Sequence, residues 1–395
     1  MQALLIIEGT YPWYRGGVSE WVYQYLLHLP EMEFTVLQIA TDEFQGLDPD
    51  KALYPLTPNI NDFIRISPPA FSSDLQKDLK AWYEDMEQAF PAGHNFDIIH
   101  VTNTGFAGFL GAHLSQDNQI PLLLTEHAIY WKEVEMGASA LECGYQIPST
   151  EIAKKHTVEH FKELARLTYQ HSDQIVTVSK VNIPEQNKLG AERVEYIPNG
   201  IPETWLVDQK RRGELPTIGW VGRCAEMKNP LAFFDYVNTF DQLGQKANFT
   251  MLLCDANEPE LQKKVIEKAK KFPQVTMIWN EPAEAYLSEF DILIITSHNE
   301  SQPLVMLEAL AKKALPVGYQ VGDFTDDFGL SFSKDRSIEE QVKRISELWA
   351  SPIDFEYLVD EKVKLIKEKH TWIEIFDEYR ALMNRMIRKE ETITF

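Results

Sequence analysis

Apolar runs that are hydrophobic at nearly every position alternate with helical segments through most of this 395-residue chain. LLIIE and IVTVS are examples, and a strand has this pattern when both faces of its sheet are covered. The strand candidates of the first half are ALLIIEG, FTVLQIA, FDIIHVTN, PLLLTEH and DQIVTVS, with helical stretches such as VSEWVYQYLLHL between them. Strands and helices in alternation predict parallel α/β layers.

This alternation breaks near residues 200–216 and then restarts with TIGWVGR, ANFTMLLCD, VTMIWNE, DILIITS and LPVGY. A chain of this length exceeds what one compact core accommodates. We therefore expect an α/β protein with two doubly wound, Rossmann-like parallel-sheet domains, over 1–200 and 201–370, facing across a cleft. Residues 371–395 contain a long amphipathic helix that we expect to pack back on the first domain.

Charge and cysteine content exclude several classes of protein. Lys and Arg total 38 against 60 Asp and Glu, a formal charge of −22, which argues against nonspecific nucleic-acid binding. Three widely spaced cysteines predict no disulfide framework and favour the cytoplasm. The opening MQALLIIEG lacks a basic n-region, and no apolar stretch reaches about 18 residues, so we expect neither a signal peptide nor a membrane span.

Two cations follow the first strand of the second half. Arg223 ends TIGWVGR, and Lys228 comes five residues later, before a helix that Asn229 would cap and Pro230 would begin. Because ligands of open parallel sheets bind at the carboxyl ends of the strands, this pair predicts an anion site suited to a diphosphate. The alternative is two solvated surface charges.

The stretch DILIITSHNESQPLVMLEALAKK repeats that arrangement. Its strand delivers Glu300 and Ser301 to the same edge, and Pro303 starts a helix whose first N–H groups, near Leu304 and Val305, face the site. Glu308 lies eight residues after Glu300, or about 12 Å at the helical rise. Two carboxylates at this spacing would grip the hydroxyls of two sugar rings; alternatively, they are a helix-cap acid and a salt-bridged flank.

Two weaker features lie in the first half. Gly16 and Gly17 separate a strand from a helix, which lets the backbone approach a ligand, although a tight turn explains them equally well. His127 ends the strand PLLLTEH and would hydrogen-bond a substrate hydroxyl; alternatively, it is a satisfied structural histidine.

HTVEH at 156–160 matches an inverted zinc-peptidase pattern but reads as part of an ordinary amphipathic helix.

Taken together, the set GGVSEWV, DIIHVTN, TEHAIY, IVTVSK, YIPNGI, VGRCAEMKNP, SHNESQPLVMLEALA and HTWIEIFDEY resembles the retaining glycosyltransferases of family 4, which have the GT-B fold. EGTYPWYRGGVSEWV and LTEHAIYWKE look closest to the branch of the Pel exopolysaccharide glycosyltransferase, which uses UDP-glucose. Family members often carry glycine where this chain has Ser301.

The resemblance implies a role for each matched residue. Arg223 and Lys228 neutralise the diphosphate of a nucleotide sugar, and Glu308 holds its ribose. Glu300 contacts the transferred sugar, helped by the N–H groups around Pro303 to Val305. Gly17 brings the backbone close to the donor, and His127 lies beside the sugar.

The resemblance also implies a partner set and a reaction. A hexose, glucose first, passes from a UDP-sugar to a hydroxyl of a glycan or other acceptor, with no cofactor and no metal. It implies cytoplasmic work in polysaccharide or glycoconjugate synthesis, peripherally associated with a membrane export complex. A nucleotide-sugar epimerase and a catalytically silent nucleotide-sugar-binding protein are the alternatives.

Overall fold

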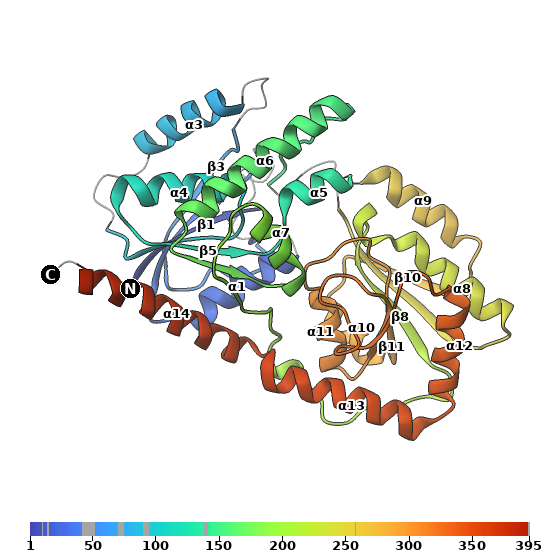
Figure 1. Cartoon of the computed structure of the whole chain (residues 1–395). Helices are drawn as coiled ribbons and strands as arrows, with labels where there is room; N and C mark the ends of the chain where they lie inside the picture. Colours follow the sequence, from blue (N-terminus) through green and yellow to red (C-terminus); the bar gives the residue numbers. More distant parts are fainter. Residues whose placement is uncertain are drawn as a thin grey trace. The chain divides into compact units, whose positions relative to one another are not determined.

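The computed structural model describes residues 1–9, 11–13, 16–41, 52–69, 75–89, 95–137, 141, 143–256 and 258–393. The chain divides into two compact units (Figure 1). Unit 1 comprises Met1–Pro198 with Phe376–Phe395, and unit 2 comprises Asn199–Ile375. The limits taken from the sequence pattern, residues 200 and 370, lie two and five residues from these divisions.

Unit 1 contains a parallel sheet with the strand order β3-β2-β1-β4-β5-β6-β7. Its strands are β1 (Gln2–Glu8), β2 (Glu33–Ile39), β3 (Ile60–Ile66), β4 (Ile98–Val101), β5 (Leu122–Glu126), β6 (Gln174–Thr177) and β7 (Val194–Tyr196). The expected inner strands are confirmed, and they are buried at nearly every position. The edge strands β3 and β7 do not stand out in the sequence because their side chains are half-buried or exposed.

Helices cover both faces of this sheet. They are α1 (Gly17–His28), α3 (Leu75–Ala89), α4 (Phe106–Asn118), α5 (Tyr130–Met136), α6 (Glu151–His171) and α7 (Ile183–Lys188), joined by the C-terminal α14 (Trp372–Ile393). Figure 1 shows α1 and α14 on one side of the sheet and α3, α4 and α6 on the other. Leu4 and Ile6 of β1 pack into the cluster formed with α4 and α6.

The glycines of α4 allow close packing of this layer. A Cβ atom on Gly108 would lie 2.5 Å from the Thr168 hydroxyl of α6, and one on Gly111 would lie 2.4 Å from Val101 of β4. The glycine spacing in GFAGFLG, residues 105–111, therefore allows α4 to pack closely against its neighbours. The segment lacks the G-x-G-x-x-G pattern of a dinucleotide-binding turn.

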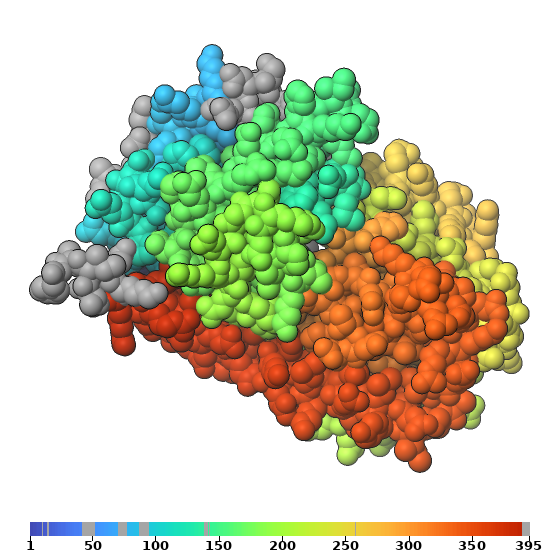
Figure 2. Space-filling model, in the orientation of Figure 1, coloured from blue at the N-terminus to red at the C-terminus, as the bar shows by residue number. Residues whose placement is uncertain are grey.

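From Phe376 onward, α14 is part of unit 1. The Thr125 hydroxyl donates to the Tyr379 hydroxyl at 3.1 Å, and Arg380 donates through Nη2 to the His28 carbonyl at 2.8 Å. Tyr25 donates to the sulfur of Met383 at 3.2 Å. The space-filling view shows the other side of this helix, coloured red, at the surface of unit 1 (Figure 2).

Unit 2 contains a second parallel sheet with the order β10-β9-β8-β11-β12-β13. The strands are β8 (Thr217–Arg223), β9 (Asn248–Cys254), β10 (Val275–Trp279), β11 (Ile292–Ile295), β12 (Leu315–Tyr319) and β13 (Leu330–Phe332). In β11, Ile292 and Ile294 pack in one hydrophobic cluster, whereas Leu293 and Ile295 pack in another. A strand between two helical layers needs apolar side chains on both faces, which explains the continuous apolar run of β11.

The helices of unit 2 are α8 (Phe233–Gln242), α9 (Pro259–Ala269), α10 (Ala283–Glu289), α11 (Leu304–Ala311), α12 (Ile338–Trp349) and α13 (Pro352–Lys369). Short 3₁₀ turns cover Glu203–Trp205, Glu226–Lys228 and Pro230–Ala232. The two sheets, both parallel and both covered on two faces, confirm the expected doubly wound α/β class.

Candidate donor site

The switch point of the second sheet lies between β8 and β11. These strands are hydrogen-bonded neighbours, and the strand order runs outward from them in opposite directions. A doubly wound sheet opens a crevice at that point, beyond the carboxyl ends of its strands. Residues that follow β8 and β11 are therefore the ones that the fold of unit 2 places for a ligand.

Lys228 and Glu300 meet at this point. Their side chains form an ion pair, although they come from loops that follow different strands. The Lys228 side chain is 25% exposed and that of Glu300 is 12% exposed, so both groups keep some access to solvent. A cation and a carboxylate are thus held together where a charged ligand would enter.

Arg223 is the last residue of β8 and is half-buried, but the helix expected after Lys228 begins later than the sequence indicates. Asn229 adopts a left-handed conformation with φ 49°, and its side chain makes no capping hydrogen bond. A 3₁₀ turn over Pro230–Ala232 then precedes α8. Asn229 is the N-cap residue of that 3₁₀ turn and Pro230 begins it, as expected, but the side-chain capping bond is not made and α8 itself begins only at Phe233.

Thr296 ties the two loops together. Its hydroxyl accepts from the Trp220 indole N–H at 2.8 Å and donates to the Lys228 carbonyl at 2.8 Å. The His298 amide donates to the Met227 carbonyl at 2.8 Å. Two consecutive carbonyls of the Lys228 turn are therefore hydrogen-bonded to the segment that follows β11. Thr296 is not among the site residues predicted from the sequence. The feature that could have indicated it is a hydroxyl side chain directly after an apolar strand.

The segment from Glu300 to Pro303 leads into α11. Pro303 is the N-cap residue of this helix, and Leu304 is its first residue. The first amides of a helix have no acceptor within it, so those of Leu304 and Val305 supply a partial positive charge at this edge of the sheet. Pro303 therefore stands one position before the place that the sequence predicts for it.

Glu308 is the fifth residue of α11 and is half-buried. The expected 12 Å separation along a helix does not apply, because residues 300–303 are not helical. From Leu304 to Glu308 the helix rises about 6 Å. Glu300 and Ser301 thus stand in a loop, and Glu308 stands on a regular helix.

In unit 1, Gly16 is the N-cap residue of α1 and Gly17 is the first residue of the helix. Gly16 has an extended backbone with φ −175°, which any residue adopts, and a Cβ atom there would meet no described atom within 4 Å. Neither the turn nor crowding within the described part of the chain demands a glycine at this position. A small side chain at this position would therefore meet no described neighbour.

His127 follows β5 and is 8% exposed. Its ring packs edge-on against the Trp21 indole at 4.7 Å between centroids. Burial lowers the pKa of this imidazole to about 3, so it is neutral near pH 7. A neutral imidazole donates or accepts a hydrogen bond but is a poor source of a proton.

Glu126, directly before His127, is fully buried. Its carboxylate accepts from Thr104 at 2.7 Å, Tyr169 at 2.6 Å and Gln186 at 2.7 Å. Burial raises the pKa of this carboxyl, against the lowering effect of the three donors. Glu126 therefore joins three segments of unit 1 behind the His127 position, a structural role that its strand-end location does not reveal.

The HTVEH segment lies within α6. His156 is exposed, and His160 lines a hollow on one side of that helix. Among the residues that the structure describes, no group of three or more His, Cys, Asp or Glu side chains is arranged to hold a metal ion. The zinc-peptidase pattern therefore finds no third ligand there.

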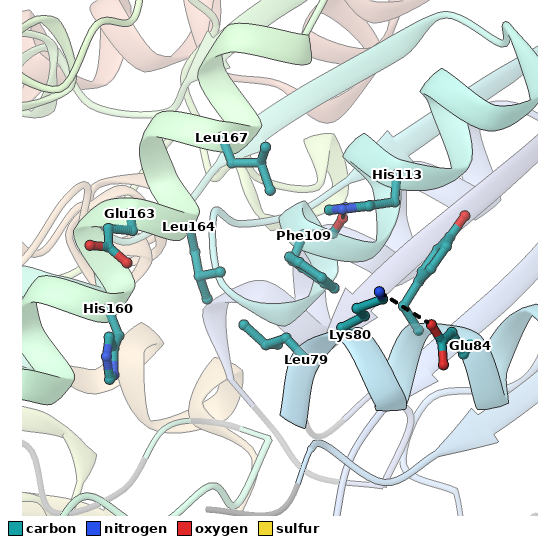
Figure 3. A pocket seen from close by; sticks show the side chains of 10 residues that line it. Leu79, Lys80, Glu84, Phe109, His113, His160, Glu163, Leu164 and Leu167 are labelled. Atoms are coloured by element: carbon teal, nitrogen blue, oxygen red, sulfur yellow. Dashed lines mark hydrogen bonds and ion pairs between the residues drawn. The ribbon is translucent and has the colours of Figure 1, made fainter. Parts of the chain in front are cut away.

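A pocket of about 620 Å³ lies between α3, α4 and α6 of unit 1 (Figure 3). Its lining is mainly apolar, with Leu79, Phe109 and Leu164 directed toward the hollow. The polar rim carries both signs of charge, including a Lys80–Glu84 pair at 3.9 Å. Such a lining does not select an anion.

None of the helices in the described ranges is long and apolar enough to cross a bilayer.

Residues 203–364 match the family model described as glycosyl transferases group 1. That match supports a group 1 glycosyltransferase. It spans β8, β11 and α11, and with them the Lys228–Glu300 pair. Residues 1–90 and 91–194 match a domain of unknown function, DUF3492.

Several known proteins are similar over most of the chain. A probable sucrose-phosphate synthase of Thermosipho melanesiensis is 23% identical over 337 residues, covering 80% of this chain and 74% of that protein. The solved sucrose-phosphate synthase of Thermosynechococcus elongatus gives a TM-score of 0.74 at 17% identity, covering 98% and 100% of the chains. HepE of Anabaena, solved with UDP-glucose, gives 0.69 at 12% identity, covering 97% and 99%. The two solved structures show that this chain has the GT-B fold.

Proposed function

We propose that the chain is a retaining hexosyltransferase that moves glucose from UDP-glucose to an acceptor hydroxyl. The observation that carries this proposal is the Lys228–Glu300 ion pair at the switch point of the second sheet. A cation for a diphosphate and a carboxylate for sugar hydroxyls stand side by side there, next to the N-terminus of α11. A nucleotide sugar is a ligand that presents both complementary groups.

The donor assignment rests on charge and on similar proteins. Arg223 and Lys228 would bind the diphosphate, because charge-assisted hydrogen bonds favour phosphate oxygens. Glu308 would accept from the ribose hydroxyls, and Glu300 and Ser301 would meet the sugar. HepE of Anabaena has been solved with UDP, with UDP and glucose, and with UDP-glucose, which favours this donor here.

The proposed step breaks the bond between the anomeric carbon and the diphosphate oxygen. The acceptor oxygen then bonds to the same face of that carbon, and its proton passes to the leaving phosphate. Arg223, Lys228 and the amides of Leu304 and Val305 stabilise the negative charge that develops on the diphosphate. Side-chain cations do this work in the proposal, so it requires no metal.

Glu300 would exchange partners when the donor binds. Its carboxylate contacts Lys228 in the structure. With the donor bound, the Lys228 ammonium would contact a phosphate oxygen, and the Glu300 carboxylate would accept from a sugar hydroxyl. His127 would hydrogen-bond a sugar hydroxyl as a neutral imidazole, in line with the depressed pKa of its buried ring. Gly16 and Gly17 would bring the α1 backbone close to the donor.

Screening nucleotide sugars tests this function. The full chain is first screened for thermal stabilisation by UDP, ADP and GDP sugars, and each stabilising donor is then incubated with sugars, sugar phosphates and oligosaccharides. The sugar phosphates include fructose phosphates, since two similar proteins are named as sucrose-phosphate synthases. Free UDP together with an α-glycoside, identified by NMR, is the expected result.

Each other outcome of the screen contradicts the proposal in a distinct way. A changed nucleotide sugar without released UDP would identify an epimerase. Stabilisation by UDP without turnover of any donor would identify a silent binding protein. A β-glycoside from an α-linked donor would overturn retention, and no stabilisation by any nucleotide would overturn the donor site.

A further inference from the structure

Gln302 lies between Glu300 and α11, and its side chain contacts two other segments of unit 2. The Asn199 amide donates to its Oε1 atom at 2.5 Å. Its Nε2 atom donates to the Asp323 carboxylate at 3.5 Å. Gln302 is 6% exposed, Asn199 5% and Asp323 7%, so the whole arrangement is buried. The side-chain amide of Gln302 therefore accepts a hydrogen bond from the Asn199 segment and donates one to the Asp323 segment.

Asn199 belongs to the segment through which the chain enters unit 2. Two backbone hydrogen bonds pair that segment with the one that precedes the exit: Ile201 to the His370 carbonyl at 2.9 Å, and Trp372 to the Ile201 carbonyl at 3.0 Å. The His370 ring also donates to the Asn199 carbonyl at 3.1 Å. Both passages of the chain between the units are therefore one hydrogen-bonded piece, and Gln302 is attached to it.

Asp323 belongs to a turn that packs against residues 300–303, the segment that we call the donor loop. Its amide donates to the Ser301 carbonyl at 2.8 Å. The neighbouring Gly322 has φ +56°, and a Cβ atom there would lie 2.2 Å from the Ser301 carbonyl oxygen and 2.5 Å from that of Glu300. The backbone of Glu300 and Ser301 therefore rests against this turn, and Gln302 links the turn to Asn199.

We propose that Gln302 is a positioning residue that fixes Glu300 and the α11 N-terminus relative to the two segments by which the chain passes between its units. Through it, a change in those passages shifts the groups that face the donor sugar. This inference rests on the proposed function for its catalytic consequence. Its structural part, the coupling of Asn199 to the donor loop, stands independently.

The chemistry of the side chain gives a sharp variant. Glutamate at position 302 keeps the acceptor for the Asn199 amide but sets a carboxylate against Asp323. Like charges in a buried place repel, and no proton lies between the two facing carboxylate oxygens. Replacing Asp323 by asparagine at the same time restores an amide that donates to the new carboxylate. The Gln302→Glu/Asp323→Asn pair therefore reverses the donor and acceptor without removing either bond.

The catalytic test compares kcat, KM and the UDP dissociation constant of these variants in the full chain. We expect Gln302→Glu to lower kcat at least about tenfold, because Glu300 and the α11 amides are displaced from the positions needed as charge develops on the diphosphate. UDP affinity should stay within about threefold of wild type, because Arg223, Lys228 and Glu308 are unchanged. The double variant should recover kcat to within about threefold. Gln320→Glu, the same change on an exposed glutamine of unit 2, should leave kcat unchanged.

Full activity of Gln302→Glu would overturn the proposal, as would a folded double variant that shows no recovery. If Gln302→Glu does not fold, the double variant decides by itself: it must fold and turn over the donor.

Hydrogen exchange separates this inference from the proposed function. Gln302→Leu removes the acceptor of the Asn199 amide, so peptides covering 199–201 and 300–303 should both exchange faster, while peptides from unit 1 keep their wild-type rates. Unchanged exchange at 199–201 would overturn the coupling. A wild-type chain that transfers no sugar would instead refute the function, and the exchange result would still report on Gln302.

Discussion

The ammonium group of Lys228 pairs with the carboxylate of Glu300 and so joins the loops that follow β8 and β11. These loops flank the switch point of the second sheet, where both side chains stay partly exposed. The pair orders the site before a donor arrives, and each group keeps lone pairs or protons for a ligand. Both groups are thus preorganised for the nucleotide sugar that we propose as the donor.

Lys228→Ala should lower kcat/KM at least about tenfold, because one charge-assisted phosphate contact is worth roughly 1.5–3 kcal/mol. Steady-state kinetics with UDP-glucose measures the loss, and circular dichroism shows whether the variant folds. Lys246→Ala, at an exposed position of the same unit, is the matched control. Near wild-type kinetics for Lys228→Ala would remove the diphosphate role from this residue.

Glu308→Gln should weaken nucleotide binding more than turnover. A neutral amide accepts a weaker hydrogen bond from a ribose hydroxyl than a carboxylate does, and the loss should be about 1 kcal/mol or about fivefold in affinity. Calorimetric titration with UDP gives the affinity directly. Glu347→Gln, at an exposed position on α12, should bind UDP like wild type. Equal affinities for the two variants would count against the ribose role.

Gly16→Ser separates a ligand role from a turn role. Serine adopts the extended N-cap conformation seen here and is a favoured N-cap residue, and its Cβ atom would meet no described atom within 4 Å. Stability should therefore be kept or raised, while added bulk beside the donor should reduce kcat/KM severalfold. Thermal denaturation and donor kinetics are measured together. A variant as active as wild type would show that no substrate approaches this backbone.

Thr296→Val should affect both stability and turnover. The change keeps the shape of the side chain but leaves the buried Trp220 indole N–H without its acceptor, which costs about 1–3 kcal/mol of unfolding free energy. It also frees the Lys228 carbonyl, so kcat should fall together with stability. Urea denaturation and kinetics test both effects. Thr239→Val, which loses only a bond within α8, is the control, and equal losses for the two would refute the special role of Thr296.

The strands could be predicted from the sequence wherever they are buried on both faces. β11 is apolar and buried along its whole length, and β8 and β9 each have a buried stretch of three residues, so their pattern and position are evident. The short β13 is half-buried and therefore carries no distinctive pattern.

The sequence also placed Arg223, Lys228 and Glu300 at strand ends, because motif position follows from strand position. Which side chains meet there does not follow, since it depends on contacts between distant segments. Gln302 contacts Asn199, 103 residues away, and Thr296 contacts Trp220, 76 residues away. The left-handed Asn229 likewise depends on how its turn is held, so a capping rule alone places the helix start too early.

His100 provides a pH-dependent contribution to stability. The ring is fully buried, with Tyr25 at 2.9 Å and Thr125 at 2.8 Å, and burial lowers its pKa to about 3. In the unfolded chain a histidine has a pKa near 6.5, so between about pH 6.5 and 3 the unfolded state binds the extra proton. The contribution is fully present above pH 6.5 and is lost as the pH falls through this window, by up to about 1.4 kcal/mol per pH unit. His127 acts with the same sign, and Glu126, whose pKa burial raises, acts with the opposite sign.

Urea denaturation between about pH 7 and 5 tests this contribution. The slope of unfolding free energy against pH should be smaller for His100→Gln than for wild type. His156→Gln, a control at an exposed position, should keep the wild-type slope. Equal slopes for all three proteins would mean that His100 gains its proton as readily in the folded chain as in the unfolded one.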